Sequence, residues 1–99
     1  MPQQLKIVTT QNGLAKTLII PVTKNQRETI QLEGIKIIVT PDDYSLQILP
    51  TQTTETVIVI HNGTILHSGN HSLTPQDTIE TVVIRKNERM IGRTMTFLE

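Results

Sequence analysis

The chain has 99 residues, the length of one small domain. Its 16 Thr, 14 Ile and 7 Val residues favour strands, because β-branched side chains lose rotamer freedom in a helix and pack well on a pleated surface. This composition excludes a helical bundle. The nine basic and nine acidic residues leave no net charge that would attract nucleic acid or an anionic membrane. The lack of cysteine excludes disulfides and thiolate sites.

Alternation of apolar and polar residues, interrupted by turn residues, predicts nine short strands along the chain. Pro21 cannot donate to a ladder, so we expect the second strand to lie at a sheet edge or to carry a bulge there. Gly34 permits a bend or bulge between the third and fourth strands. The expected strands span residues 4–10, 14–23, 28–33, 35–40, 44–49, 56–61, 64–68, 78–85 and 89–97.

The strongest local signal is the dipeptide Asn62-Gly63, which supplies the two positive-φ residues of a type I′ turn and predicts a β-hairpin. Residues 69–73 are expected to form a loop after this hairpin. Residues 74–77 then begin with Thr-Pro and end with Asp, which is typical of a helix start. We therefore expect at most one short helical turn, near residues 75–78.

Short, regularly spaced strands joined by turns predict a single all-β domain over residues 1–99, an antiparallel β-sandwich or small β-barrel of seven to nine short strands. Tyr44 and Phe97 are the only aromatic residues. The core must therefore be built from Ile, Leu and Val.

The first residues carry no apolar run of the kind that a secretory signal needs. The longest apolar runs, residues 18–22 and 57–60, are far shorter than the roughly 20 residues that span a bilayer. We expect a soluble, cytoplasmic protein, or a component of the virion if the chain is viral.

The three histidines, His61, His67 and His71, fall within eleven residues and form the most site-like cluster. Converging imidazoles could hold zinc, and Asp77 could add a carboxylate ligand. However, the expected hairpin register places His67 opposite Ile58, so that His61 and His67 emerge on different sides of the sheet. A small metal- or ligand-binding protein is therefore one alternative function.

A basic cluster, Arg85, Lys86, Arg89 and Arg93, lies on the last expected hairpin. Lys and Arg side chains on one face can contact the phosphates of a nucleic acid. An OB-like nucleic-acid-binding domain is therefore the second alternative function. Such domains also use aromatic platforms on which bases stack, and Phe97 is the only ring on this hairpin. The competing interpretation is a solvated edge with ion pairs.

Catalytic groups are not expected, and neither is a cofactor. Asp42 and Asp43 are adjacent in a turn, where their side chains diverge instead of facing each other across a cleft. Ser68 and Ser72 each follow a histidine, but consecutive residues on a strand point apart and form no dyad. We therefore predict that the protein is not an enzyme.

Several expected strands are apolar on both faces, at residues 18–20, 37–39, 57–60 and 82–84. A two-layer sandwich buries one face of each sheet, so another surface must cover the second. The leading hypothesis is a non-enzymatic interaction or assembly module, a structural or accessory subunit that acts through a sheet face or edge. We expect a protein partner or a homo-oligomer, no membrane partner, and nucleic acid only under the alternative above.

Overall fold

The structure, a computed structural model, describes residues 3–22, 27–40, 43–50, 54–74, 76–86 and 90–98. None of these residues is helical, so this part of the chain contains no helix that could cross a membrane. Ten strands lie in the described ranges: β1 (Gln3–Gln11), β2 (Leu14–Val22), β3 (Glu28–Leu32), β4 (Ile35–Val39), β5 (Tyr44–Ile48), β6 (Glu55–His61), β7 (Thr64–Leu66), β8 (Asn70–Leu73), β9 (Thr78–Arg85) and β10 (Ile91–Leu98).

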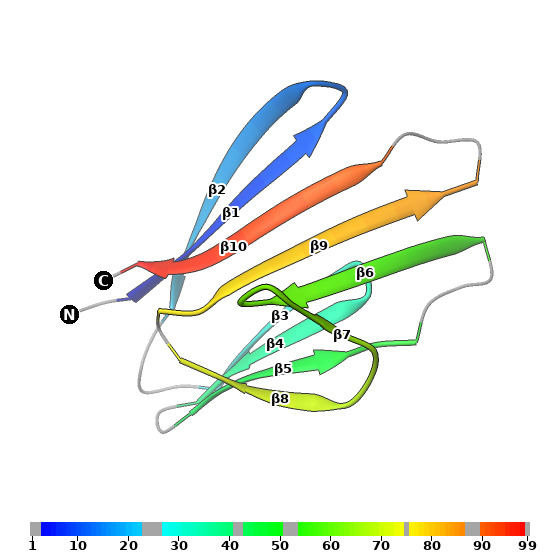
Figure 1. Ribbon diagram of the computed structural model, residues 1–99. Helices are drawn as coiled ribbons and strands as arrows, with labels where there is room; N and C mark the ends of the chain where they lie inside the picture. The colour runs from blue at the N-terminus through cyan, green and yellow to red at the C-terminus, as the bar shows by residue number, and fades with distance from the viewer. Residues whose placement is uncertain are drawn as a thin grey trace.

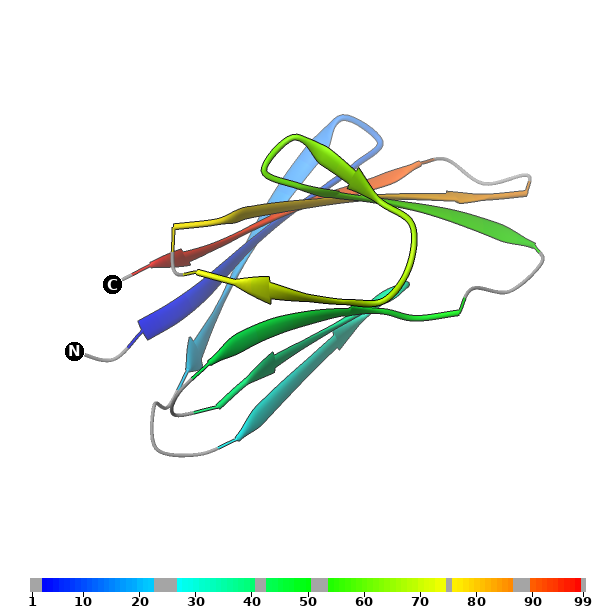
Figure 2. The same cartoon turned by 60° about the horizontal axis from the view of Figure 1, so that its bottom comes forward.

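The strands form two antiparallel sheets that face each other as two layers (Figures 1 and 2). The larger sheet has the order β2-β1-β10-β9-β6-β7, and the smaller has the order β3-β4-β5-β8. The predicted all-β class is confirmed, and the architecture is a sandwich. β1 and β10 pair along their length, with Gln4 opposite Leu98, so the start of β1 and the end of β10 lie side by side (Figure 1).

The core lies between the two layers and is aliphatic, as the composition predicts. Every second residue of a strand points into it, which is why burial alternates along β4 and β9. The two aromatic residues meet there, with the ring centroids of Tyr44 and Phe97 4.9 Å apart. The buried cluster comprises Leu5, Ile7, Val22, Ile35, Ile37, Val39, Leu46, Val59, Leu73, Ile79, Met95 and Phe97.

The predicted turn at Asn62-Gly63 is confirmed, because both residues have positive φ, 49° and 84°. Asn12-Gly13 forms the same kind of turn between β1 and β2, with φ of 56° and 77°. Pro21 lies on β2, an end strand of the larger sheet, which agrees with the expected edge position.

The segment expected as a loop, residues 69–73, instead contains β8, which pairs with β5 of the smaller sheet. The expected pairing of His67 with Ile58 is also wrong, because β7 ends at Leu66. The two differences have one cause: after β7 the chain leaves the larger sheet and crosses to the smaller one. Gly69, with φ of 92°, lies in this crossing.

Near residues 75–78 the described chain is not helical. The Asp77 N–H donates to the Thr74 carbonyl at 3.1 Å, and the Asp77 carboxylate accepts from the Thr74 N–H at 2.9 Å. This is the acid-to-cap contact of a helix start. β9 begins at Thr78, so no helix can follow the turn.

Candidate functional site

The most exposed apolar segment of the described chain is β2, at one edge of the larger sheet. β1 pairs with one side of β2, and no described strand pairs with the other side. Leu14, Leu18 and Ile19 are 69%, 58% and 47% exposed. Leu14 and Leu18 share a face with the buried Val22, but the tip of the β1–β2 hairpin extends away from the smaller sheet, which leaves them uncovered (Figure 1).

The outer face of the larger sheet is a second partly exposed apolar surface. Ile58 lies opposite Val82, and Ile60 lies opposite Ile65. Ile84 continues this surface along β9 and is 38% exposed. The neighbouring residues along β6 and β9 point into the core, so these strands are apolar on both faces.

His61 belongs to a hydrogen-bonded cluster around Asp77. His61 Nε2 lies 2.7 Å from Asp77 Oδ2, Asn62 Nδ2 donates to Oδ1 at 2.9 Å, and the Thr74 hydroxyl donates to Oδ1 at 2.8 Å. Burial of Asp77 would raise the pKa of its carboxyl group, but the hydrogen bonds from Asn62, His61 and Thr74 outweigh burial and lower the pKa well below its ordinary value. The cluster fastens the β6–β7 hairpin to the start of β9, because Asn62 Oδ1 also accepts the N–H of Thr78 at 2.8 Å.

The other two histidines lie elsewhere. His71 Nε2 donates to the Ser68 carbonyl at 2.8 Å, and His67 is exposed beyond the end of β7. No three His, Asp or Glu side chains are placed to hold a metal ion among the described residues, which include all three histidines. The structure thus joins His61 to Asp77, the carboxylate that the sequence suggested, but does not bring the histidines together.

Two arginines of the basic cluster make ion pairs with glutamates. Arg85 Nη2 lies 2.6 Å from Glu33 Oε2, and Arg85 Nε lies 3.3 Å from Glu55 Oε2. Hydrogen bonds to these two carboxylates raise the pKa of Arg85 above its ordinary value. Arg93 Nη2 lies 3.9 Å from Glu33 Oε1.

For the other two residues of the basic cluster, the structure describes no contact with a carboxylate. Lys86 is exposed after β9, and Arg89 lies outside the described residues. Of the described members of this cluster, Arg85 and Arg93 are thus engaged by glutamates and Lys86 alone has no carboxylate partner among the described residues.

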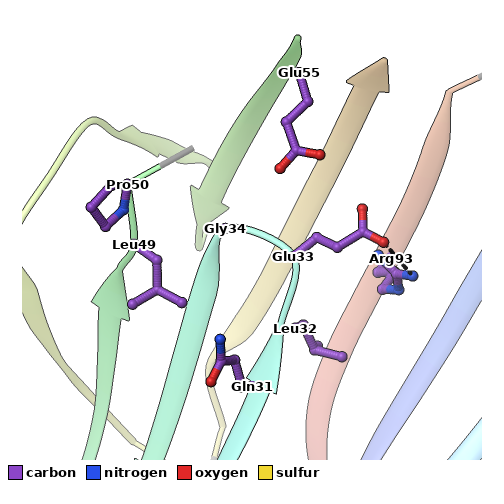
Figure 3. A pocket seen from close by; sticks show the side chains of 8 residues that line it. All are labelled: Gln31, Leu32, Glu33, Gly34, Leu49, Pro50, Glu55 and Arg93. Atoms are coloured by element: carbon purple, nitrogen blue, oxygen red, sulfur yellow. Dashed lines mark ion pairs between the residues drawn. The ribbon is translucent and has the colours of Figure 1, made fainter. Parts of the chain in front are cut away.

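A pocket of about 570 Å³ lies beside these ion pairs, next to the turn between β3 and β4 (Figure 3). Glu33 and Glu55 contribute acidic groups and Arg93 a basic one, while Leu32, Leu49 and Pro50 supply apolar walls. Both of these glutamates are engaged by arginines, Glu33 by Arg85 and Arg93 and Glu55 by Arg85.

Only part of these features can be recognised in the sequence. The two-faced apolar run at residues 18–20 and the edge position of Pro21 pointed to β2, but Leu14 was not singled out. Glu33 was also missed. Its partners Arg85 and Arg93 are more than fifty residues away along the chain, and no local pattern encodes that contact.

Comparison with known protein families, curated protein sequences and solved structures gives no match for this chain.

Proposed function

We propose that this protein is a non-enzymatic interaction or assembly module that acts through the exposed edge of its six-stranded sheet. The observation that carries the proposal is β2: nine residues long, unpaired on one side in the described structure, and bearing the exposed side chains of Leu14, Leu18 and Ile19. A long apolar edge strand is a template for pairing with another chain.

Natural sheets usually protect their edges with short strands, charges, proline or bulges. The other end strands of the two sheets are shorter: β3 has five residues, β8 has four and β7 has three. β2 has one charged residue, Lys16, its proline, Pro21, stands next to its last residue, and its pairing with β1 runs without a bulge, so residues 14–20 carry little of this protection. An edge left this open is consistent with a strand that binds a partner.

The two alternatives have no comparable support. Metal binding would need the histidines to converge, whereas His61 is engaged by Asp77 and His71 by a backbone carbonyl. Single-strand nucleic-acid binding would need an OB-like barrel with unpaired basic residues, whereas the described strands form two separate sheets and Arg85 contacts two glutamates.

Self-association tests the proposal most directly. Size-exclusion chromatography with light scattering, carried out from micromolar to millimolar protein, should show an oligomer whose population rises with concentration. The double variant Leu18→Lys/Ile19→Lys should be monomeric, because it places charge on the apolar edge.

Ser72→Lys is the matched control, since Ser72 is exposed on β8 in the smaller sheet. It should associate as the unmodified protein does, and circular dichroism should report the same strand content for all three proteins. A monomer at every concentration, or an oligomer that the double variant leaves intact, would overturn the proposal.

A further inference from the structure

The backbone groups that β2 presents at the edge follow from its pairing with β1. Gln11 pairs with Leu14 across the Asn12-Gly13 turn, and the register continues unbroken to Val22. In a two-residue hairpin the pair that flanks the turn is hydrogen-bonded, and hydrogen-bonded and non-hydrogen-bonded pairs then alternate. The even-numbered residues of β2 therefore direct their N–H and C=O groups to β1.

The odd-numbered residues direct their backbone groups away from β1, toward the unpaired side. Ala15, Thr17 and Ile19 each offer one N–H and one C=O there. The next residue of this set, Pro21, has no N–H, so the run of outward donors ends before it. Three donors and three acceptors thus form a short ladder centred on Thr17.

This pattern of donors and acceptors is its own complement. When a second β2 is laid antiparallel with Thr17 opposite Thr17, Ala15 of each copy lies opposite Ile19 of the other. Every outward N–H and C=O of these three residues then has a partner, and Pro21 stays outside the ladder. A register moved toward Val22 would bring Pro21 into the ladder and leave a carbonyl unpaired. A register moved toward the Asn12-Gly13 turn would instead leave the outward groups of Ile19 opposite the turn.

The side chains permit the same register. Lys16, the only charged residue of β2, lies opposite Leu18 of the other copy, where its aliphatic stem covers exposed apolar surface while its ammonium group stays in water. Leu14 lies opposite Ile20. The chain as a whole has no net charge, so two copies do not repel each other at long range.

We infer that β2 pairs antiparallel with β2 of a second copy of this chain, about a two-fold axis at Thr17, so that the two larger sheets become one continuous sheet. The inference rests on the proposed function and names the partner and the register. A two-fold arrangement is the commonest symmetry of homo-oligomers, and it closes on itself without forming a filament.

Single cysteine variants test the register, because the chain contains no cysteine of its own. Directly opposed residues of a hydrogen-bonded pair have Cα atoms about 5.5 Å apart, within the range that a disulfide bridges. Under mild oxidation Thr17→Cys should convert to a covalent dimer several-fold faster than Ile19→Cys, whose counterpart lies diagonally across the ladder. Thr94→Cys, exposed in the middle of the same sheet on β10, is the matched control and should remain largely monomeric.

The outcomes separate the two proposals. If the unmodified protein associates but Thr17→Cys crosslinks no faster than Thr94→Cys, the inferred pairing is wrong while the proposed function stands. Fastest crosslinking at Ile19 also overturns the register. If light scattering shows only monomer, the proposed function itself fails, and the inference fails with it.

Discussion

Thr81 is a polar residue in an apolar layer. It lies on β9 with its side chain in the core, is 1% exposed, and its hydroxyl has no hydrogen-bond partner among the described residues. A buried hydroxyl without a partner loses its hydrogen bonds to water and gains none in the folded protein. Thr81 therefore makes the folded protein less stable than an apolar residue of the same shape would.

The substitution Thr81→Val should stabilise the protein by about 1 kcal/mol, because it replaces the unpaired hydroxyl with a methyl group of similar shape. Urea denaturation should show a higher midpoint with an unchanged slope. Thr94→Val, at an exposed position on the next strand, should change the free energy of unfolding by less than about 0.5 kcal/mol. A lower midpoint for Thr81→Val would show that the hydroxyl makes a stabilising contact.

At the scale of the structural elements, Asp77 determines how the turn before β9 is held. Its carboxylate accepts hydrogen bonds from three residues, and its side chain is 12% exposed. The pKa of Asp77 is lowered in the folded state, so this carboxylate stabilises the fold above its unfolded pKa, near 4, and the contribution is lost as the pH falls below that value.

Asp77→Asn should lower the free energy of unfolding at pH 5 by about 1–3 kcal/mol, because the hydrogen bonds lose their charged acceptor. The difference from the unmodified protein should shrink at pH 3. The comparison between the two pH values tests the charge of this carboxylate, because the asparagine of the variant does not ionise. Urea denaturation of both proteins at both pH values measures the effect, and a difference that stays constant would contradict the assignment.

Most strands and hairpins could be predicted from the sequence, because turn residues and the alternation of apolar and polar residues are local signals. Asn62-Gly63 identified its hairpin, and the pattern at residues 78–85 gave the bounds of β9. β8 was missed because its residues are mostly polar and it exists only through pairing with β5, more than twenty residues earlier. The contact between His61 and Asp77 was suggested by proximity, but the ion pairs of Glu33 depend on how the two sheets stack, which no local pattern records.

At the scale of the whole molecule, the two sheets meet at Gly34. This residue forms the turn between β3 and β4 with φ of 79°, and a Cβ atom added there would lie 2.6 Å from Val57 Cγ1 on the larger sheet. Glu33, its neighbour, contacts Arg85 and Arg93 on the same sheet. The turn is therefore a point where apolar packing and ion pairs both join the layers.

Gly34→Ala should destabilise the protein through two effects. A side chain at positive φ costs about 1–2 kcal/mol, and the collision with Val57 should add about 1–3 kcal/mol. Gly13→Ala is the matched control, because Gly13 has nearly the same φ, 77°, but no atom within 4 Å of the added Cβ. Urea denaturation should give a larger loss for Gly34→Ala, and equal losses would show that the sheets separate at this turn without cost.

The pairing of β1 with β10 has a consequence for how the polypeptide is threaded. Because Gln4 and Leu98 are ladder partners, a short linker between these two residues could close the sandwich into a ring. The ring could then be opened at the exposed Asn12-Gly13 turn without removing a rung from any ladder. The order in which the strands follow one another in the chain is thus not fixed by the sandwich, and a circularly permuted chain satisfies the same packing.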